Sequence, residues 1–569
     1  MKTAKKLSAA SILCLLAMTL ALCGCGTTGE SPATTVPAES TQAPTTVATE
    51  PPHNWETGYI GGLSSETAYY GEDGAPLGTF TRGTQVEYEM TSDGSYSVLL
   101  DDAIVYLSEE AAVVTDAADI IPAHSLYVRT AVNLQDEGCR LMETFADKGT
   151  AVEVTGYDYL LEDGTAHMYR VTLDGQEGYI RPWYLCGSEA DALANYDSGS
   201  YATHAGRENR YGGGGAADLD YFPREKGPIP GNEMPAECRT LYLVNWRLDE
   251  VDAYLKIAEG SGINAFVVDI VDGGAVGYAA DVMNEYCPSG AAAANNTAEE
   301  YKAAIQKLKD AGYYVIGRIT TFNDSFYVQD HPEHAIAKDN GDPRKLSGAY
   351  WPSPYIRDVW QYKVDLAVEA AELMGFNEIQ FDYVRFPDNT GRYEKKGTID
   401  FRNTYGETKA QAVQRFLMYA TDILHEHGVY VSADVYGESA FAYVTAYGQY
   451  WPAISNTVDA ISGMPYPDHF GAEGSWLPWE HPYDLLLSWG QQAMQRQDET
   501  ATPAVIRTWI QAYNAIREPY TVYGPEEVGA QIQALRDAGC TGGYMTWNAG
   551  SSLDKYTSLI PAFAPPEEE

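Results

Sequence analysis

Charged side chains interrupt apolar segments in the second half of the chain, and their types suit proton transfer and nucleophilic attack. In EIQFDYVRFP, residues 378–387, Asp382 and Arg385 lie among β-branched and aromatic residues typical of a strand. A buried strand avoids such charges unless they are compensated, so their presence there needs a reason. The carboxylate of Asp382 near the end of a predicted strand is therefore the first candidate for chemistry.

Polar side chains also close the other predicted strands of this region. In a barrel of parallel strands, the carboxyl ends of the strands meet at one rim. Unlike charges gathered there compensate one another, whereas any one of them alone could be a satisfied structural group. The residues at strand ends are Asp269, Asp272, Arg318, Asp382, Arg385, Asp434, Glu438, Tyr466, Asp468, Arg507, Trp509, Gln511, Trp547 and Asn548.

Alternating strands and amphipathic helices must position these residues. Helices are predicted over 251–259, 297–311, 359–374, 408–427 and 525–538. Strands are predicted over 240–245, 265–271, 313–319, 378–384, 429–435, 460–464, 504–510 and 543–547. Eight strand–helix repeats in roughly three hundred residues predict an α/β fold of the (β/α)8 TIM-barrel type. A doubly wound open sheet is the alternative, but no GxGxxG motif follows the first strand.

Several motifs of this region resemble a known family. The segments NAFVVDIVDGG, YYVIGRITTFND, YWPSPYIRDVWQY, GFNEIQFDYVRFPD, SADVYG and MPYP resemble the "putative glycoside hydrolase domain" family of bacterial envelope proteins. The family is related to the alpha-amylase-like glycosidases, so the resemblance implies a TIM barrel and hydrolysis of O-glycosyl bonds in a glycan or polysaccharide. It covers most of the chain after Cys238.

The resemblance also implies roles for the strand-end residues. Glycoside cleavage requires two carboxyl groups that flank the scissile bond. By analogy with alpha-amylase-like barrels, Asp382 is expected to be the nucleophile and Asp434 the general acid/base, with Glu438 replacing Asp434 if Asp434 points into the barrel. Cationic partners for Asp382 are expected in Arg318 and Arg385, and Asp269 is expected to bind sugar hydroxyls or orient Arg318. The remaining substrate-binding candidates are Tyr466, Arg507, Trp509 and Trp547.

Neither a metal nor a cofactor is expected. No CxxC pair occurs after Cys25, and the HPEH segment, with His331 and His334, is predicted to be a turn that enters a helix. A metal-dependent deacetylase would need a His/Asp cluster that the strand ends lack. The competing function is a carbohydrate-binding protein on a degenerate, non-catalytic barrel, in which the same groups would only hydrogen-bond hydroxyls.

The charge of the chain restricts its partners. Lys and Arg number 37 against 80 Asp and Glu, which gives a formal net charge of −43 at pH 7. Such a chain repels nucleic acids. The 43 tyrosines and 11 tryptophans offer flat faces that suit sugar rings, although most must serve packing.

The first residues predict export and a lipid anchor. Residues 1–25 have a Lys-containing start, an apolar run and the sequence Leu-Cys-Gly-Cys, which resembles a bacterial lipoprotein signal with Cys25 as the lipidated residue. Residues 26–54 are rich in Thr and Pro and are predicted to be a flexible tether. The expected location is the outer face of the bacterial cytoplasmic membrane.

Two small modules are predicted before the barrel. Residues 55–118 show short strands with turns at Gly74, Gly83 and Gly94, and residues 119–188 resemble a bacterial Src-homology-3-like domain through the motif VRTAVNL and DGQEGYIRPWYL. That resemblance implies binding to peptidoglycan, whereas the alternative is a spacer. Cys139 and Cys186 could pair in the second module. Residues 189–237 are predicted to be a linker or wrapping segment, and 238–564 the barrel.

Overall fold

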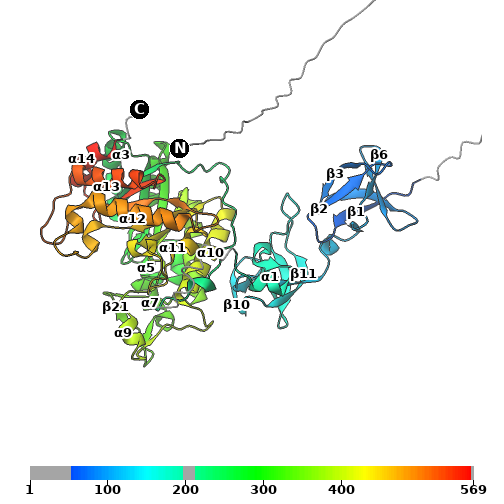
Figure 1. The fold of residues 1–569 in the computed structure, drawn as a ribbon, viewed down its shortest axis with the longest axis horizontal. Coiled ribbons are helices and arrows are strands. Elements are labelled where there is room, and N and C mark those ends of the chain that lie inside the picture. Colours follow the sequence, from blue (N-terminus) through cyan, green and yellow to red (C-terminus); the bar gives the residue numbers. More distant parts are fainter. Residues whose placement is uncertain (1–52, 197–211, 565–569) are drawn as a thin grey trace, which may run out of the picture. The chain divides into compact units, whose positions relative to one another are not determined.

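A computed structural model of the chain describes residues 53–196 and 212–564 (Figure 1). The predicted signal, Cys25, nearly all of the predicted tether and part of the linker lie outside the described residues. Among the described residues, no helix combines the length and apolar character needed to span a bilayer.

The two N-terminal modules are antiparallel sheets with one common strand order. The first contains β1 (Glu56–Gly61), β2 (Glu66–Tyr70), β3 (Pro76–Thr81), β4 (Gln85–Met90), β5 (Tyr96–Leu100), β6 (Ala103–Leu107) and β7 (Ala112–Val114). The second contains β8 (His124–Val128), β9 (Val132–Gln135), β10 (Leu141–Ala146), β11 (Ala151–Tyr157), β12 (Tyr169–Leu173), β13 (Gln176–Ile180) and β14 (Leu185–Cys186). The orders β3-β2-β6-β5-β4-β1-β7 and β10-β9-β13-β12-β11-β8-β14 are the same when each sheet is numbered from its own first strand. The all-β prediction is confirmed for both modules, and their Src-homology-3-like identity stays a prediction.

Parallel strands of the C-terminal region form a nearly closed barrel sheet. Its strands are β15 (Cys238–Leu243), β16 (Ala265–Asp272), β19 (Tyr314–Thr320), β23 (Glu378–Asp382), β25 (Tyr430–Tyr436), β26 (Ala460–Met464), β27 (Val505–Ile506), β28 (Thr508–Gln511) and β29 (Gly543–Trp547). The order is β27-β26-β25-β23-β19-β16-β15-β29-β28. Only Arg507 separates β27 from β28, so the predicted seventh strand pairs with β26 through one half and with β29 through the other. The prediction of a barrel of parallel strands is confirmed, in the form of this nearly closed sheet.

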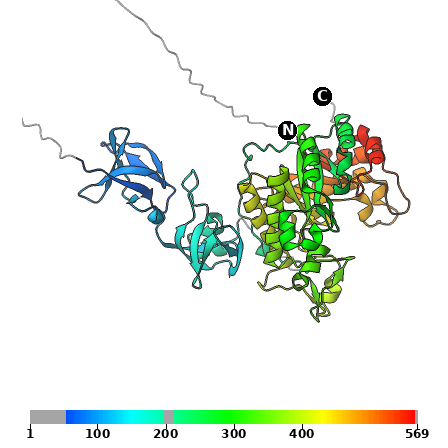
Figure 2. The ribbon, with the colours of Figure 1, turned by 180° about the vertical axis from the view of Figure 1, so that it is seen from behind.

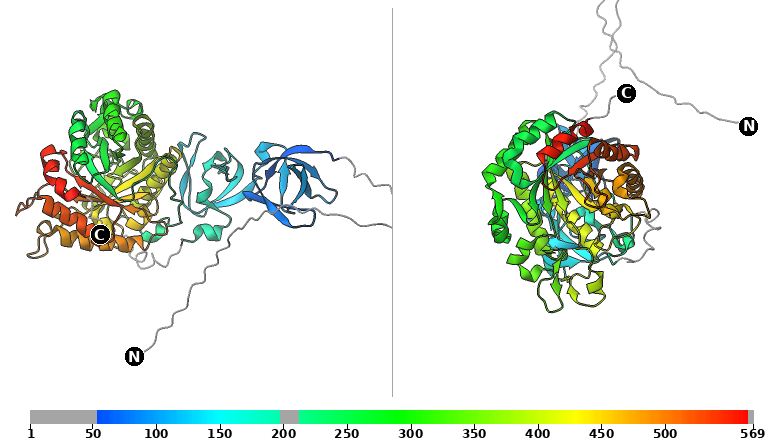
Figure 3. Two further views of the ribbon diagram at one scale, coloured as in Figure 1. Left: turned by 90° about the horizontal axis from the view of Figure 1, so that it is seen from above. Right: turned by 90° about the vertical axis from the view of Figure 1, so that its left-hand side faces the viewer.

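Helices cover the outside of this sheet in each of the views (Figures 2 and 3). They are α3 (Val251–Glu259), α6 (Ala298–Asp310), α8 (Arg357–Met374), α10 (Lys409–Glu426), α11 (Trp451–Ser455), α12 (Pro482–Gln497), α13 (Pro525–Asp537) and α14 (Leu553–Leu559). All five predicted helices are present. Capping boxes at Thr297 and Thr408 begin α6 and α10, and Gly375 ends α8 in the left-handed conformation that glycine favours.

The fourth strand is shorter than predicted. It ends at Asp382, and Tyr383 leaves the sheet with a φ of 49°. The amide of Tyr383 donates to Oδ1 of Asp382 over 2.5 Å, so the carboxylate takes the hydrogen bond that the ladder would otherwise receive. Asp382 is therefore the last residue of its strand.

The second module packs against the outer helices of the barrel. Met418 of α10 belongs to the apolar core of this module, together with Val128, Leu134 and Val171. At its edge, Nε of Arg357 in α8 donates to the side chain of Asn133 over 2.8 Å. The module and the barrel thus share buried side chains.

The structure bears on two expectations about short features. Cys139 and Cys186 do not pair, since both are free thiols, and Sγ of Cys186 instead donates to the carbonyl of Tyr127. The HPEH segment does lead into a helix, although a short one: His331 follows α7 (Ser325–Asp330), and Pro332–His334 form the 3-10 helix η5.

Candidate active site

Arg318 lies at the centre of a buried group of carboxylates inside the barrel. Its Nη1 is 2.6 Å from Oδ1 of Asp269 and 3.3 Å from Oδ1 of Asp272. Its Nη2 and Nε donate to Oδ2 of Asp382 over 2.5 and 3.2 Å. Its Nε is also 3.7 Å from Oδ2 of Asp434.

Four neighbouring strands supply this group. Asp269 is on β16, Arg318 on β19, Asp382 on β23 and Asp434 on β25, and these strands are consecutive in the sheet order. The carboxyl ends of parallel strands meet at one end of a barrel, which brings together residues far apart in the sequence. The structure thus joins Asp269, Arg318, Asp382 and Asp434, as the strand-end pattern predicts.

Side chains of β23 show how the barrel interior is layered. Residues two apart in a strand face the same side, so Glu378, Gln380 and Asp382 all point inward at successive levels. Glu378 binds Arg507, Gln380 donates to Ser462, and Asp382 binds Arg318. Asp382 therefore belongs to the uppermost of three polar layers.

One cation faces more carboxylates than it can neutralise. Asp269, Asp382 and Asp434 are buried around Arg318, and the side chain of Asp272 is only 30% exposed. Burial, and secondarily the charge of Asp382, raises the pKa of Asp434 well above its usual value. Burial likewise raises the pKa of Asp269 to about 7, against the opposing effect of Arg318. Protonated carboxyl groups are thus favoured beside the Arg318–Asp382 pair.

Asp434 points into the barrel with one hydrogen-bonded oxygen and one oxygen that faces Arg318. Its Oδ1 accepts from Nε1 of Trp509 over 2.7 Å. Its Oδ2 has no hydrogen-bond donor among the described residues. A protonated Oδ2 could donate to a bound molecule.

Glu438 and Arg385 do not join the Arg318 group. Both oxygens of Glu438, in η6 (Gly437–Ala440), accept hydroxyl groups over 2.8 Å, one from Tyr443 and one from Tyr447. Arg385 was expected to pair with Asp382, but it donates to the hydroxyl of Tyr436 over 2.6 Å and to the carbonyl of Phe386. The chain turns after Asp382, and this directs Arg385 to the aromatic side of the rim.

Arg507 was expected at the rim, and this expectation is wrong. It lies two residues before Trp509 on the same inward face, so its side chain is one layer deeper in the barrel. There its Nη1 is 2.7 and 2.9 Å from the two oxygens of Glu378, at the start of β23. Because both side chains are fully buried, Arg507 is a structural partner of Glu378.

The predicted aromatic residues gather beside Arg318, although most are buried. Trp509 and Tyr466 are 1% and 5% exposed, which leaves no open face for stacking. Trp547 is partly exposed, and the guanidinium of Arg318 lies 5.4 Å from its ring centre. Only Trp547 of these three keeps the surface expected of a sugar platform.

Sequence reasoning missed Tyr242. Its hydroxyl donates to Oδ2 of Asp269 over 2.5 Å, and its ring lies 4.8 Å from that of Trp547. Its signal was weak, since a tyrosine in the apolar strand TLYLVN is typical of a barrel core. In position, however, it holds Asp269 opposite Arg318.

Comparisons with known proteins support the family resemblance. Residues 240–553 match the family model described as "Putative glycosyl hydrolase domain". No curated protein matches the chain.

Solved structures also match. A hypothetical protein from Ruminiclostridium thermocellum is 35% identical, with 34% of this chain and 97% of that chain covered at a TM-score of 0.29. The PgaB (BpsB) glycoside hydrolase domain from Bordetella bronchiseptica is 15% identical, with 57% and 99% covered at 0.41. A family GH18 chitinase from Chromobacterium violaceum is 14% identical, with 59% and 84% covered at 0.34.

Proposed function

Because the chain belongs to the family described as "Putative glycosyl hydrolase domain", we propose that it hydrolyses glycosidic bonds in a glycan or polysaccharide, with Asp382 and Asp434 as the carboxyl pair. The observation that carries this proposal is the bridging of the two carboxyl groups by Arg318. Two carboxyl groups with different protonation are the requirement of glycoside cleavage.

Asp382 is the proposed nucleophile. Arg318 donates two charge-assisted hydrogen bonds to its Oδ2, and these stabilise the carboxylate anion. An anionic oxygen is needed for attack on the anomeric carbon. Its place at the last residue of β23 also matches the rim position typical of catalytic groups in such barrels.

Asp434 is the proposed general acid/base. Its raised pKa favours the protonated form, which can give a proton to the leaving oxygen, and its Oδ2 accepts no hydrogen bond from the described residues. Glu438 was to replace Asp434 if Asp434 pointed into the barrel, as it does. We retain Asp434 because Asp382 faces the same interior layer, whereas two tyrosine hydroxyls occupy the oxygens of Glu438.

The shared cation also limits the reaction geometry. Nε of Arg318 is 3.2 Å from Oδ2 of Asp382 and 3.7 Å from Oδ2 of Asp434, so these oxygens are no farther apart than the sum of the two distances. That limit includes the separation of about 5 Å found in retaining enzymes and only the shortest separations, about 6.5 Å, of inverting ones. Retention of anomeric configuration is the expected outcome.

The cellular setting is part of the proposal. The signal-like residues 1–25 support export with Cys25 lipidated on the outer face of the cytoplasmic membrane. The two β modules are proposed to be Src-homology-3-like and to bind peptidoglycan. Their common strand order supports a duplicated unit.

The test is a hydrolysis and binding screen of the full-length protein on polysaccharides and glycan arrays. Asp382→Asn and Asp434→Asn should lower turnover by about 10²- to 10⁴-fold while glycan binding persists. Asp388→Asn is the matched control, since Asp388 lies in the loop after β23, where its carboxylate accepts hydrogen bonds from Ser347 and Asn389. Glu438→Gln should retain most activity.

Two results would change the assignment. Loss of turnover in Glu438→Gln with activity kept in Asp434→Asn would transfer the acid role to Glu438. Binding without turnover in the wild-type protein across the screen, unaltered in Asp382→Asn, would instead support a non-catalytic carbohydrate-binding barrel.

A further inference from the structure

Within the part of the chain that the structure describes, two clusters of potential metal ligands lie outside the carboxylate group of the barrel. One consists of Cys139, His167 and Glu426, and the other of His331, Glu333 and His334. In each, one ligand atom per residue lies within 4.8 Å of the others. Their surroundings decide which of them can accept a cation.

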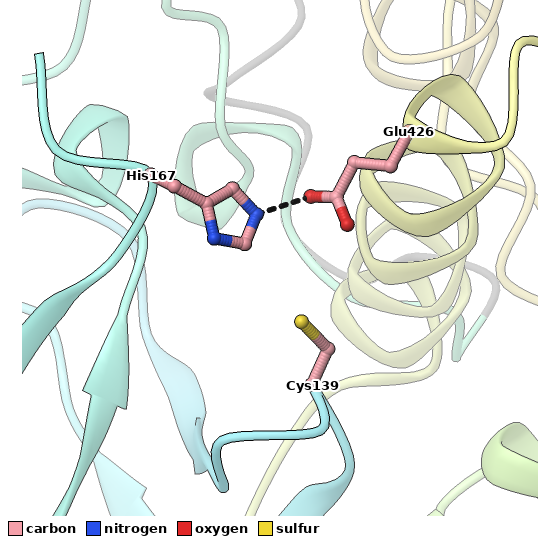
Figure 4. A group of neighbouring side chains, drawn as sticks. All are labelled: Cys139, His167 and Glu426. Atoms are coloured by element: carbon pink, nitrogen blue, oxygen red, sulfur yellow. Dashed lines mark hydrogen bonds and ion pairs between the residues drawn. The ribbon is translucent and has the colours of Figure 1, made fainter. Parts of the chain in front are cut away.

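The first cluster already contains a cation. His167 of the second module points at Glu426, the last residue of α10, and Nε2 is 2.7 Å from Oε1 (Figure 4). Arg181 hydrogen-bonds this same Oε1, and its Nη1 is 3.0 Å from Nε2 of His167. Hydrogen bonds to Asp158 and Glu426 outweigh burial and raise the pKa of His167 to about 9. A protonated imidazole beside a guanidinium repels a metal ion, so this cluster is an ion-pair contact between module and barrel.

The second cluster brings imidazole nitrogens close to carboxylate oxygens. Nδ1 of His331 is 3.4 Å from Oε1 of Glu333, and Nε2 of His334 is 3.5 Å from Oδ2 of Asp358 in the first turn of α8. Two ligands held about 2.0–2.2 Å from a tetrahedral Zn²⁺ lie roughly 3.4 Å apart. Both pairs therefore have the separation of neighbouring ligands on one ion.

The two imidazoles are also oriented from their far sides. Nε2 of His331 is 2.8 Å from the carbonyl oxygen of Tyr286. A proton on Nε2 is donated to this oxygen, and Nδ1 then keeps its lone pair for a metal ion. Nδ1 of His334 is 2.9 Å from the hydroxyl of Tyr327, which can accept that proton and leave Nε2 free. Metal-binding histidines commonly have such a partner on the second nitrogen.

We propose that His331, Glu333 and His334, with Asp358 as a fourth ligand, bind one divalent transition-metal ion of the zinc type. Two imidazoles and two carboxylates suit Zn²⁺, Ni²⁺ or Co²⁺ better than Mg²⁺ or Ca²⁺. The side chains of Glu333 and Asp358 are 63% and 72% exposed, so an ion can enter from solvent. A bound metal ion would connect η5 to the start of α8. Both elements follow β19, the strand that carries Arg318.

The probe is Zn²⁺ alone, titrated by calorimetry into the untagged, chelator-treated full-length protein. Co²⁺ absorption is the second readout, because it reports tetrahedral coordination independently of any catalytic activity. We expect one site, weakened at least about tenfold by His331→Ala or His334→Ala. Glu333→Gln, at an exposed position, tests a ligand without threatening the fold.

Matched variants separate this site from other histidines. His427→Ala removes an exposed imidazole that also pairs with one carboxylate, at 2.8 Å from Glu372, and should leave Zn²⁺ binding unchanged. Cys139→Ser should do the same. The proposal is overturned if no saturable site is found, if the His331 and His334 variants bind Zn²⁺ as the wild type does, or if Cys139→Ser abolishes binding.

Discussion

Replacing Asp269 by Asn tests the electrostatics of the Arg318 group. Asp269 is fully buried and accepts hydrogen bonds from Tyr242 and Arg318. Burial chiefly, with a contribution from the charge of Asp272, raises the pKa of Asp269 from 3.8 to about 7. The folded protein therefore binds this proton more tightly than the unfolded chain does.

The magnitude follows from this difference in pKa. The proton stabilises the fold fully below about pH 4, and the stabilisation is lost as the pH rises through about 7. A shift of roughly three units corresponds to about 4 kcal/mol of unfolding free energy. Asn at this position does not titrate, so Asp269→Asn should gain about that much stability relative to the wild type between pH 4 and pH 8.

Urea unfolding followed by tryptophan fluorescence, at several values of pH, measures the effect. Subtracting the unfolding free energy of one protein from that of the other cancels the contribution of every group that titrates alike in both. Asp272→Asn is the control, because its partly exposed carboxylate shares Arg318. A difference between wild type and Asp269→Asn that stays constant from pH 4 to pH 8 would refute the reasoning.

Two further predictions concern buried contacts inside the barrel. Arg507→Met leaves Glu378 buried without its cation and should lower the free energy of unfolding by about 3–5 kcal/mol, while the double variant with Glu378→Met should recover much of it in the same urea assay. Trp509→Phe removes the donor to Oδ1 of Asp434, which stabilises the ionised form, so the alkaline limb of the pH–rate profile should move about one unit higher. A limb that moved lower, or did not move, would contradict the role of Asp434 as the acid.

Much of the barrel was predictable because its strands are apolar runs bounded by turns and helices with clear caps. The exceptions arise from single contacts. The strand pattern continues through Tyr383 and Val384, but the carboxylate of Asp382 binds the next amide and ends the strand. A local hydrogen bond of this kind leaves no trace in hydrophobic periodicity.

The members of the candidate site were predictable from their positions at strand ends, but their depth in the barrel was not. Strand-end positions identified Asp269, Arg318, Asp382 and Asp434, since parallel strands converge. They did not specify the level of each side chain within the barrel. Arg507 looks like a strand-end residue in sequence, yet the strand continues to Gln511, and two residues of offset move its side chain one layer down.

The packing of Met418 into the second β module has a practical consequence. A recombinant fragment that began at Cys238, the predicted barrel boundary, would leave Met418 uncovered and Arg357 without Asn133. Such a fragment would expose apolar surface and tend to aggregate. A fragment of residues 119–564 would preserve these contacts. In it, the second module and the barrel should unfold in one cooperative transition and not in two separate ones.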